Sequence, residues 1–125
     1  MKNLKIEATK YTPEIDLKLN GEMSLRGKSY TENTFEFYTP MMKWFEQYFK
    51  ASPSHTTLIN MEITYFNSSS SKLFFDFFDL LEENITTNII RINWIYDIEN
   101  ESAKEAGEDF IEDFEELAIV LTTKD

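Results

Sequence analysis

Strand-like and helix-like segments alternate over the second half of the chain, and this alternation limits the possible folds more than any other feature. The apolar segments 57–66, 88–96 and 117–121 are predicted strands. The segments 69–83 and 101–115 repeat apolar residues with helical spacing. Because the connections are short, each strand has to return in the same direction through a crossover helix. The pattern therefore predicts parallel β-α-β-α-β units.

The first half of the chain follows a different pattern. Segment 4–9 alternates apolar and polar residues, and two further alternating runs flank Asn20-Gly21, which is a strong hairpin signal. An amphipathic helix is predicted to start at Thr39-Pro40, because proline is tolerated in the first turn, with a short turn or helix over 33–38 before it. The expected fold class is α/β (α+β), with a single mixed β-sheet, an N-terminal antiparallel hairpin and about three main helices.

Composition narrows the function classes. The chain has 125 residues, of which 42% are hydrophobic and 15% aromatic, and this predicts one folded domain over residues 1–125. A net charge of −11 opposes binding to nucleic acid or to an anionic membrane. The absence of cysteine and of a long apolar segment leads us to expect a cytoplasmic protein.

Residues for catalysis are sparse. His55 is the single histidine and is expected in a loop, and no glycine-rich phosphate loop or nucleophile elbow is present. The acidic residues of segment 101–116 are expected to form a solvated helix face. We therefore expect no enzyme activity, no metal and no cofactor, while a small hydrolase or ligand-binding domain using the serine cluster and His55 is a weaker alternative.

The serine cluster Ser68–Ser71 lies where a predicted strand meets a predicted helix. Ser68 or Ser69 is expected to cap this helix by accepting a hydrogen bond from a free backbone N–H. A phosphate on the same hydroxyl would be stabilised by the positive helix end. The cluster is therefore either a capping turn alone or a phosphorylation switch.

The helix after this cluster has an unusual outer face. Its apolar stripe is centred near Phe77, whereas Phe75 points about 160° away from that centre. Ser68, Lys72, Phe75 and Asp79 are predicted to form one row on the outer face. The aromatic ring is either an anchor for a protein partner or is covered by another element.

Several motifs in order give the chain a family resemblance. It resembles the SiaC family of bacterial regulatory phosphoproteins over almost its full length. The resemblance lies in the following segments: Ile6-Glu7-Ala8-Thr9-Lys10-Tyr11-Thr12-Pro13-Glu14, Gly27-Lys28-Ser29-Tyr30, Glu32-Asn33, Phe37-Tyr38-Thr39-Pro40, Tyr65-Phe66-Asn67-Ser68-Ser69-Ser70-Ser71-Lys72, Asn93-Trp94-Ile95-Tyr96-Asp97 and Ala106-Gly107-Glu108-Asp109.

The resemblance implies a partner-switching adaptor in bacterial signal transduction. It implies a Ser/Thr kinase of the histidine-kinase-like ATPase type, a PP2C-type phosphatase and an effector such as a diguanylate cyclase, which links the protein to cyclic di-GMP and biofilm formation. The phosphoacceptor position falls on Ser68, where many relatives carry threonine, and Thr31 stands where proline is expected. We expect Asn67, Ser69, Ser70, Lys72, Phe75 and Asp79 to form the partner-binding site.

The layout is also similar to anti-sigma-factor antagonists of the STAS type, in which a phosphoserine begins a helix after a strand. This similarity is at the level of the fold, and a fold does not determine function. An antagonist-type module that acts on another effector is therefore the alternative function.

Overall fold

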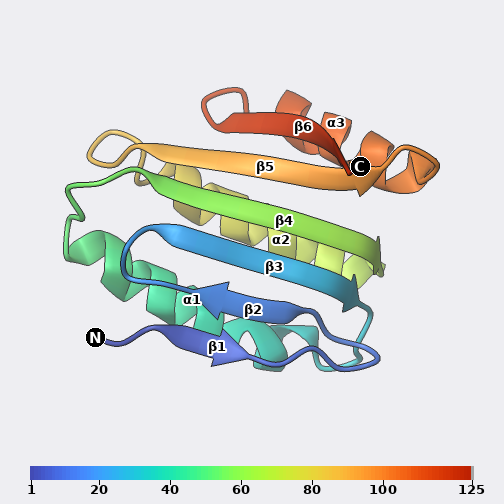
Figure 1. Ribbon diagram of the computed structural model, residues 1–125, viewed down its shortest axis with the longest axis horizontal. Helices are drawn as coiled ribbons and strands as arrows, with labels where there is room; N and C mark the ends of the chain where they lie inside the picture. The colour runs from blue at the N-terminus through green and yellow to red at the C-terminus, as the bar shows by residue number, and fades with distance from the viewer. Residues whose placement is uncertain (125) are drawn as a thin grey trace.

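A computed structural model describes residues 1–124, and within this range six strands form one mixed sheet in the order β1-β2-β3-β4-β5-β6 (Figure 1). Strands β1, β2 and β3 pair antiparallel, and β3, β4, β5 and β6 pair parallel. The predicted fold class is confirmed, and β3 and β4 add a further parallel crossover. The elements are β1 Leu4–Ile6, β2 Glu14–Leu17, β3 Glu22–Ser29, α1 Thr34–Lys50, β4 Thr57–Phe66, α2 Ser68–Glu82, β5 Ile90–Asp97, α3 Glu101–Asp113 and β6 Ala118–Lys124.

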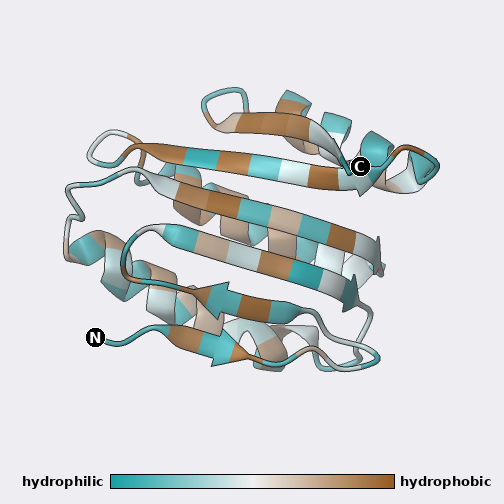
Figure 2. Ribbon diagram, viewed as in Figure 1, coloured by the Kyte–Doolittle hydropathy of each residue, from teal (hydrophilic) through white to brown (hydrophobic). Residues whose placement is uncertain are grey.

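The helices α1, α2 and α3 lie on one face of the sheet, and the other face is uncovered (Figure 1). This follows from the topology, because the parallel strands advance in one direction and crossovers share one hand. Apolar and polar residues alternate along the strands accordingly (Figure 2). The core between sheet and helices is rich in fully buried aromatic rings, including those of Tyr38, Phe45, Phe74, Phe77, Phe78 and Trp94.

Helix α1 begins five residues earlier than the predicted start at Thr39-Pro40, so that start was wrong, and the short turn or helix expected over 33–38 is the first part of α1. Pro40 lies inside the helix and cannot donate a hydrogen bond to the carbonyl oxygen of Glu36. Both residues are exposed, so water can satisfy that carbonyl group. The opposite face of the helix buries Tyr38, Met41 and Phe45, and this burial outweighs the local cost of the proline.

Helix α3 packs unusually close to the sheet. A Cβ atom on Gly107 would lie 2.5 Å from Trp94 Cδ1 and 2.6 Å from Leu121 Cδ2, so glycine is needed for this approach. The Trp94 indole N–H donates a hydrogen bond to the Ala103 carbonyl oxygen at 2.8 Å. None of the helices within residues 1–124 is long and apolar enough to cross a membrane.

Strands β4 and β5 separate towards their carboxyl ends. Their pairing runs from Thr57 and Ile90 to Met61 and Trp94, whereas β4 continues to Phe66 and β5 to Asp97. Beyond the last pair, the Asn100 side chain donates a hydrogen bond to the Thr64 carbonyl oxygen at 3.0 Å.

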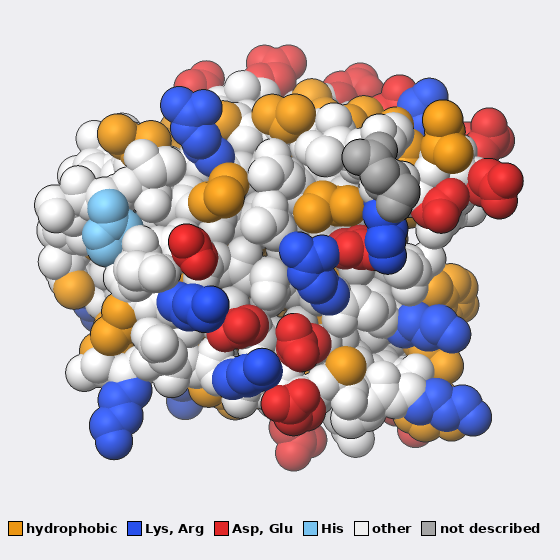
Figure 3. All heavy atoms as spheres, in the orientation of Figure 1, with side chains coloured by type: hydrophobic (Ala, Val, Ile, Leu, Met, Phe, Trp, Pro, Cys, Tyr) orange, Lys and Arg blue, Asp and Glu red, His pale blue; other side chains and the backbone are white. Residues whose placement is uncertain are grey.

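The uncovered face carries charges of both signs, interspersed with small patches of hydrophobic side chains (Figure 3). Glu62 forms ion pairs with Arg26 and with Lys124, each at 2.7 Å. Because both basic side chains are about half exposed, these pairs add little to stability. A polar open face fits an antiparallel or mixed sheet that is covered on one side only.

Candidate functional site

A β-bulge shapes the junction between β4 and α2. The register of β3 and β4 shifts between Gly27 and Lys28, so that Gly27 pairs with Ile63 and Lys28 with Tyr65, leaving Thr64 as the extra residue. A bulge reverses the alternation of side chains along a strand. Tyr65 is therefore 56% exposed, whereas the regular alternation expected for a strand over 57–66 would place it on the buried face with Ile63.

After the bulge, Phe66 turns into the core, where its ring centroid lies 5.6 Å from that of Phe74 and 6.2 Å from that of Trp94. The next residue, Asn67, is extended and caps helix α2, because its Oδ1 accepts a hydrogen bond from the Ser70 N–H at 3.0 Å. The expectation that Ser68 or Ser69 is the cap was therefore wrong. The sequence also contained asparagine, a good capping residue, one position earlier.

The four serines of the cluster differ in their surroundings. Ser70 is fully buried, and its hydroxyl donates to the Ser29 carbonyl oxygen at 2.7 Å. Ser69 Oγ lies 2.7 Å from Thr34 Oγ1 and 3.1 Å from Asn67 Oδ1. Ser71 is half-buried, whereas Ser68 is exposed at the first position of the helix. Ser68 is thus the serine of this cluster that an enzyme can reach most easily.

A buried chain of hydroxyl groups lies beneath Ser68. The Ser29 Oγ is 2.7 Å from the Ser70 Oγ and 2.7 Å from the Tyr38 hydroxyl. Burial raises the pKa of Tyr38, although its hydrogen bond with Ser29 opposes this shift. The phenol therefore stays protonated and can donate to Ser29, so the chain ties α1, β3 and the first turn of α2 together.

The predicted outer row of α2 is present, since Ser68, Lys72, Phe75 and Asp79 are all exposed. Phe75 is 42% exposed, and one side of its ring packs against Phe114 with centroids 4.7 Å apart. The expectation that another element covers Phe75 is met in part, because the end of α3 covers one side of the ring. The other side is open to solvent, and its role as a partner anchor stays a prediction.

Sequence reasoning missed Phe35, which is 47% exposed in the first turn of α1. The Lys72 ammonium group lies 6.0 Å from the centre of the Phe35 ring. The helix had been predicted to start at Thr39, so Phe35 had no assigned face. Extending the helical periodicity through Pro40 would have placed it at the border of the apolar face, one turn before Tyr38.

Three tyrosines, of which Tyr11 and Tyr65 are exposed, lie on the other side of the junction and were also missed. The rings of Tyr11 and Tyr30 are 5.1 Å apart, and those of Tyr30 and Tyr65 are 5.3 Å apart, both edge to face. The Tyr30 N–H donates to the Tyr11 carbonyl oxygen at 3.0 Å, which holds the first loop against the end of β3. Three segments that carry the family resemblance therefore meet next to Ser68.

Helix α2 presents unpaired amides at this end. Its first intrahelical bond runs from the Ser71 N–H to the Asn67 carbonyl oxygen, so the amides of Ser68 and Ser69 precede it. Helix α3 has the same arrangement, because the Asn100 side chain accepts from the Ala103 N–H at 3.1 Å. At the position equivalent to Ser68, however, α3 carries Glu101, a permanent negative charge.

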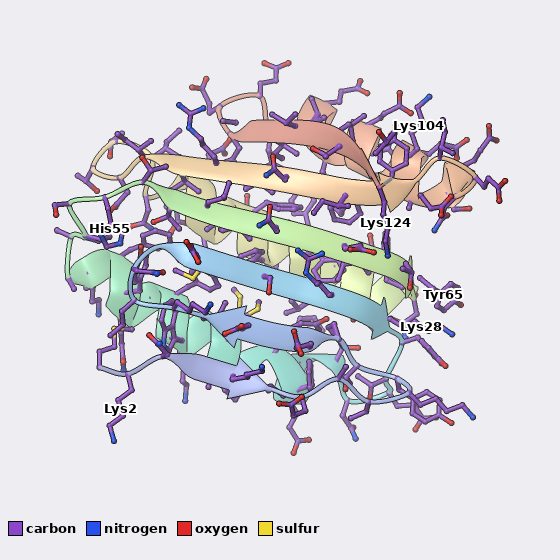
Figure 4. All side chains as sticks on the ribbon, viewed as in Figure 1. Lys2, Lys28, His55, Tyr65, Lys104 and Lys124 are labelled. Atoms are coloured by element: carbon purple, nitrogen blue, oxygen red, sulfur yellow. The ribbon has the colours of Figure 1, made fainter. Side chains whose placement is uncertain are left out.

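The weaker alternative of a serine hydrolase finds no geometric support. His55 precedes the amino end of β4 and Ser68 follows its carboxyl end, a separation of about 30 Å for a strand of this length. Figure 4 shows His55 and Tyr65 at opposite ends of the sheet. His55 Nε2 lies instead 3.1 Å from the Tyr48 hydroxyl. Within residues 1–124, no group of three or more histidine, aspartate or glutamate side chains is arranged to hold a metal ion.

Comparison with known proteins agrees with the resemblance. Residues 6–124 match a family model described as SiaC family regulatory phosphoprotein. An uncharacterized protein of Pseudomonas aeruginosa strain UCBPP-PA14 is 35% identical over 115 residues, which cover 90% of each chain. The solved structure of SiaC from Pseudomonas aeruginosa has a TM-score of 0.88 at 29% identity and covers 99% of this chain and 100% of its own.

A second solved structure is the diguanylate cyclase SiaD in complex with its activator SiaC, also from Pseudomonas aeruginosa. The match has a TM-score of 0.88 at 31% identity and covers 97% of this chain and 99% of that chain. Because the family model spans nearly the whole sequence, this chain belongs to the SiaC family.

Proposed function

We propose that this protein is a non-enzymatic adaptor that binds and activates a diguanylate cyclase, and that phosphorylation of Ser68 switches this binding off. A Ser/Thr kinase of the histidine-kinase-like ATPase type would add the phosphate, and a PP2C-type phosphatase would remove it. The similarity to the activator in the cyclase complex supports the choice of effector. The observation that carries the proposal is that Ser68 is exposed at the head of the outer row of α2, which also carries the exposed ring of Phe75.

The local geometry favours a phosphate on Ser68. The free amides of the first turn of α2 and the positive end of its dipole would stabilise two negative charges at this position. Glu101 already places a carboxylate at the equivalent position of α3, so this cap motif tolerates an anion. Phosphorylation would therefore strengthen the first turn of α2 and leave the fold intact.

The effect on binding would come from the outer surface. Phe75 is the expected anchor, with Lys72 and Asp79 at its rim, and Asn67, Ser69 and Ser70 hold the backbone that presents Ser68. A phosphate at the head of this row would have to be desolvated on docking and would repel acidic groups of the effector. Phosphorylation of Ser68 would thus weaken docking of the effector on this row.

The test uses the purified chain, the kinase and the diguanylate cyclase from the same organism. Intact mass and phosphopeptide mapping should find one phosphate, on Ser68, and Ser68→Ala should abolish it while keeping cyclase binding. Ser68→Asp should weaken binding, although a carboxylate carries less charge than phosphate. A phosphate found only on Ser69, Ser70 or Ser71 would contradict the assignment.

The docking surface is tested by Phe75→Ala, which should weaken cyclase binding by about 2 kcal/mol or more. Ile89→Ala is the matched control, because Ile89 is 62% exposed and precedes the amino end of β5, whereas Ser68 follows the carboxyl end of β4. Thermal unfolding of both variants shows whether the fold is kept. Wild-type affinity in a folded Phe75→Ala protein would place the effector elsewhere.

A further inference from the structure

The tyrosines at the carboxyl end of the sheet form a surface that the proposed switch does not use. The bulge at Thr64 turns Tyr65 outward, and Tyr30 and Tyr11 continue the row with edge-to-face contacts of 5.3 and 5.1 Å. Tyr65 is 56% and Tyr11 49% exposed, and Tyr30 between them is half-buried. We call Tyr11, Tyr30 and Tyr65 the tyrosine row. A row of contiguous aromatic rings with two exposed members is a costly surface unless a partner covers it.

A hollow of about 400 Å³ adjoins the tyrosine row and is lined by Tyr11, Tyr30, Thr31, Glu32 and Asn33. Among these lining residues, Glu32 carries the carboxylate and is exposed. Aromatic ring faces and a carboxylate both attract a cation. The hollow therefore has the lining expected for a positively charged side chain.

One lysine of the chain already makes a contact of this kind with a ring of the tyrosine row. The Lys10 ammonium group lies 5.8 Å from the centre of the Tyr11 ring, within the range of a cation–π contact. Lys28 also projects at this end of the sheet (Figure 4) and contributes a positive charge near Tyr65. The faces of Tyr30 and Tyr65 have no such partner among the cation–π contacts within residues 1–124.

We infer that the tyrosine row and its hollow bind an extended, arginine-bearing segment of a protein partner. A guanidinium group is favoured because it stacks on aromatic rings and can form a paired hydrogen bond with the Glu32 carboxylate. The net charge of −11 attracts a basic segment over a longer range. This surface lies on the sheet side of Ser68 and the α2 row on the helix side, so a partner can contact one or both. The inference rests on the proposed function for its biological setting only.

The test uses a short synthetic peptide with one central arginine, and a matched peptide in which citrulline replaces it. Both are titrated into the unphosphorylated protein at physiological salt and followed by amide NMR shifts. The arginine peptide should shift the amides of Tyr30, Thr31 and Tyr65 and bind about fivefold tighter than the citrulline peptide. A fivefold change corresponds to about 1 kcal/mol, the size of one exposed cation–π contact.

Variants distinguish binding at the tyrosine row from binding at the acidic surfaces of the protein. Tyr65→Ala and Tyr30→Ala should each weaken arginine-peptide binding about fivefold, and Tyr30→Phe should keep it, because the ring faces make the contact. Ile89→Ala is the control and should bind the peptide as the wild type does, because Ile89 is exposed at the opposite end of the sheet. Equal binding of both peptides, shifts confined to the acidic α3, or folded alanine variants with unchanged affinity would overturn the inference. No cyclase or kinase is needed, so failure of the proposed switch would not alter this result.

Discussion

Replacing Ser70 with alanine removes a hydroxyl from the buried chain that runs beneath Ser68. In the wild type, the Ser70 hydroxyl donates to the Ser29 carbonyl oxygen and lies 2.7 Å from the Ser29 Oγ. Alanine leaves both Ser29 groups without this partner in a site where Ser29 and Ser70 are fully buried. Leaving buried polar groups unpaired costs about 1 to 3 kcal/mol, so we expect Ser70→Ala to lower the free energy of unfolding by about 2 kcal/mol.

Urea unfolding followed by circular dichroism measures this change, and thermal unfolding should show a Tm lower by about 8 °C for a chain of this size. Ser68→Ala is the matched control two positions away. Its hydroxyl is exposed and Asn67 provides the cap, so its free energy of unfolding should change by less than about 0.5 kcal/mol.

A double-mutant cycle with Ser29→Ala tests the contact itself. If the two hydroxyls form one chain, the combined loss should be smaller than the sum of the single losses by about 1 kcal/mol. The reasoning is refuted if Ser70→Ala is as stable as the wild type, or if Ser68→Ala is destabilised by the same amount. In either case, the division between a structural Ser70 and an accessible Ser68 would not hold.

Two further predictions concern the core. Gly107→Ala should lower the free energy of unfolding, measured in urea, by about 2 kcal/mol, because the added Cβ would meet the buried Trp94 ring. This overpacking costs more than the higher helix propensity of alanine contributes. Glu105→Ala is the control, because Glu105 is exposed on the same helix. The free energy of unfolding should fall as pH rises above about 10, because burial raises the pKa of Tyr38 in the folded state and the unfolded state loses its proton first. Stability measured against pH should decline less steeply in Tyr38→Phe, and an unchanged slope would contradict the assignment.

The regular elements could be predicted from the sequence because their apolar residues follow one period over many positions. The hairpin at Asn20-Gly21 and the parallel β-α-β-α-β units are of this kind. The exposed face of α2 could also be derived, since the position of Phe75 follows from helical geometry alone.

Local exceptions were not predictable in the same way. Nothing in the strand pattern of residues 57–66 signals a bulge at Thr64, because the bulge depends on Gly27 in the neighbouring strand, which has a φ of +134°. The exposure of Tyr65, and with it the tyrosine row, depends on that long-range pairing. The early start of α1 likewise depends on tertiary burial that overrides a proline.

At the end of the sheet that carries Ser68, β4 and β5 no longer pair, so the strand ladder is interrupted there. Beyond Met61 and Trp94, the two strands are joined by the Asn100 hydrogen bond and by the packing of Phe66 on Trp94, and not by a continuous ladder. A displacement of the Ser68 backbone would therefore be passed on by hydrogen bonds to β3 and α2, because Asn67 and Ser70 bond to both elements. Strands β5 and β6 with α3 are coupled to this junction through side-chain packing, including that of Phe75 on Phe114, so the proposed switch would reach that half of the protein without a shared strand ladder.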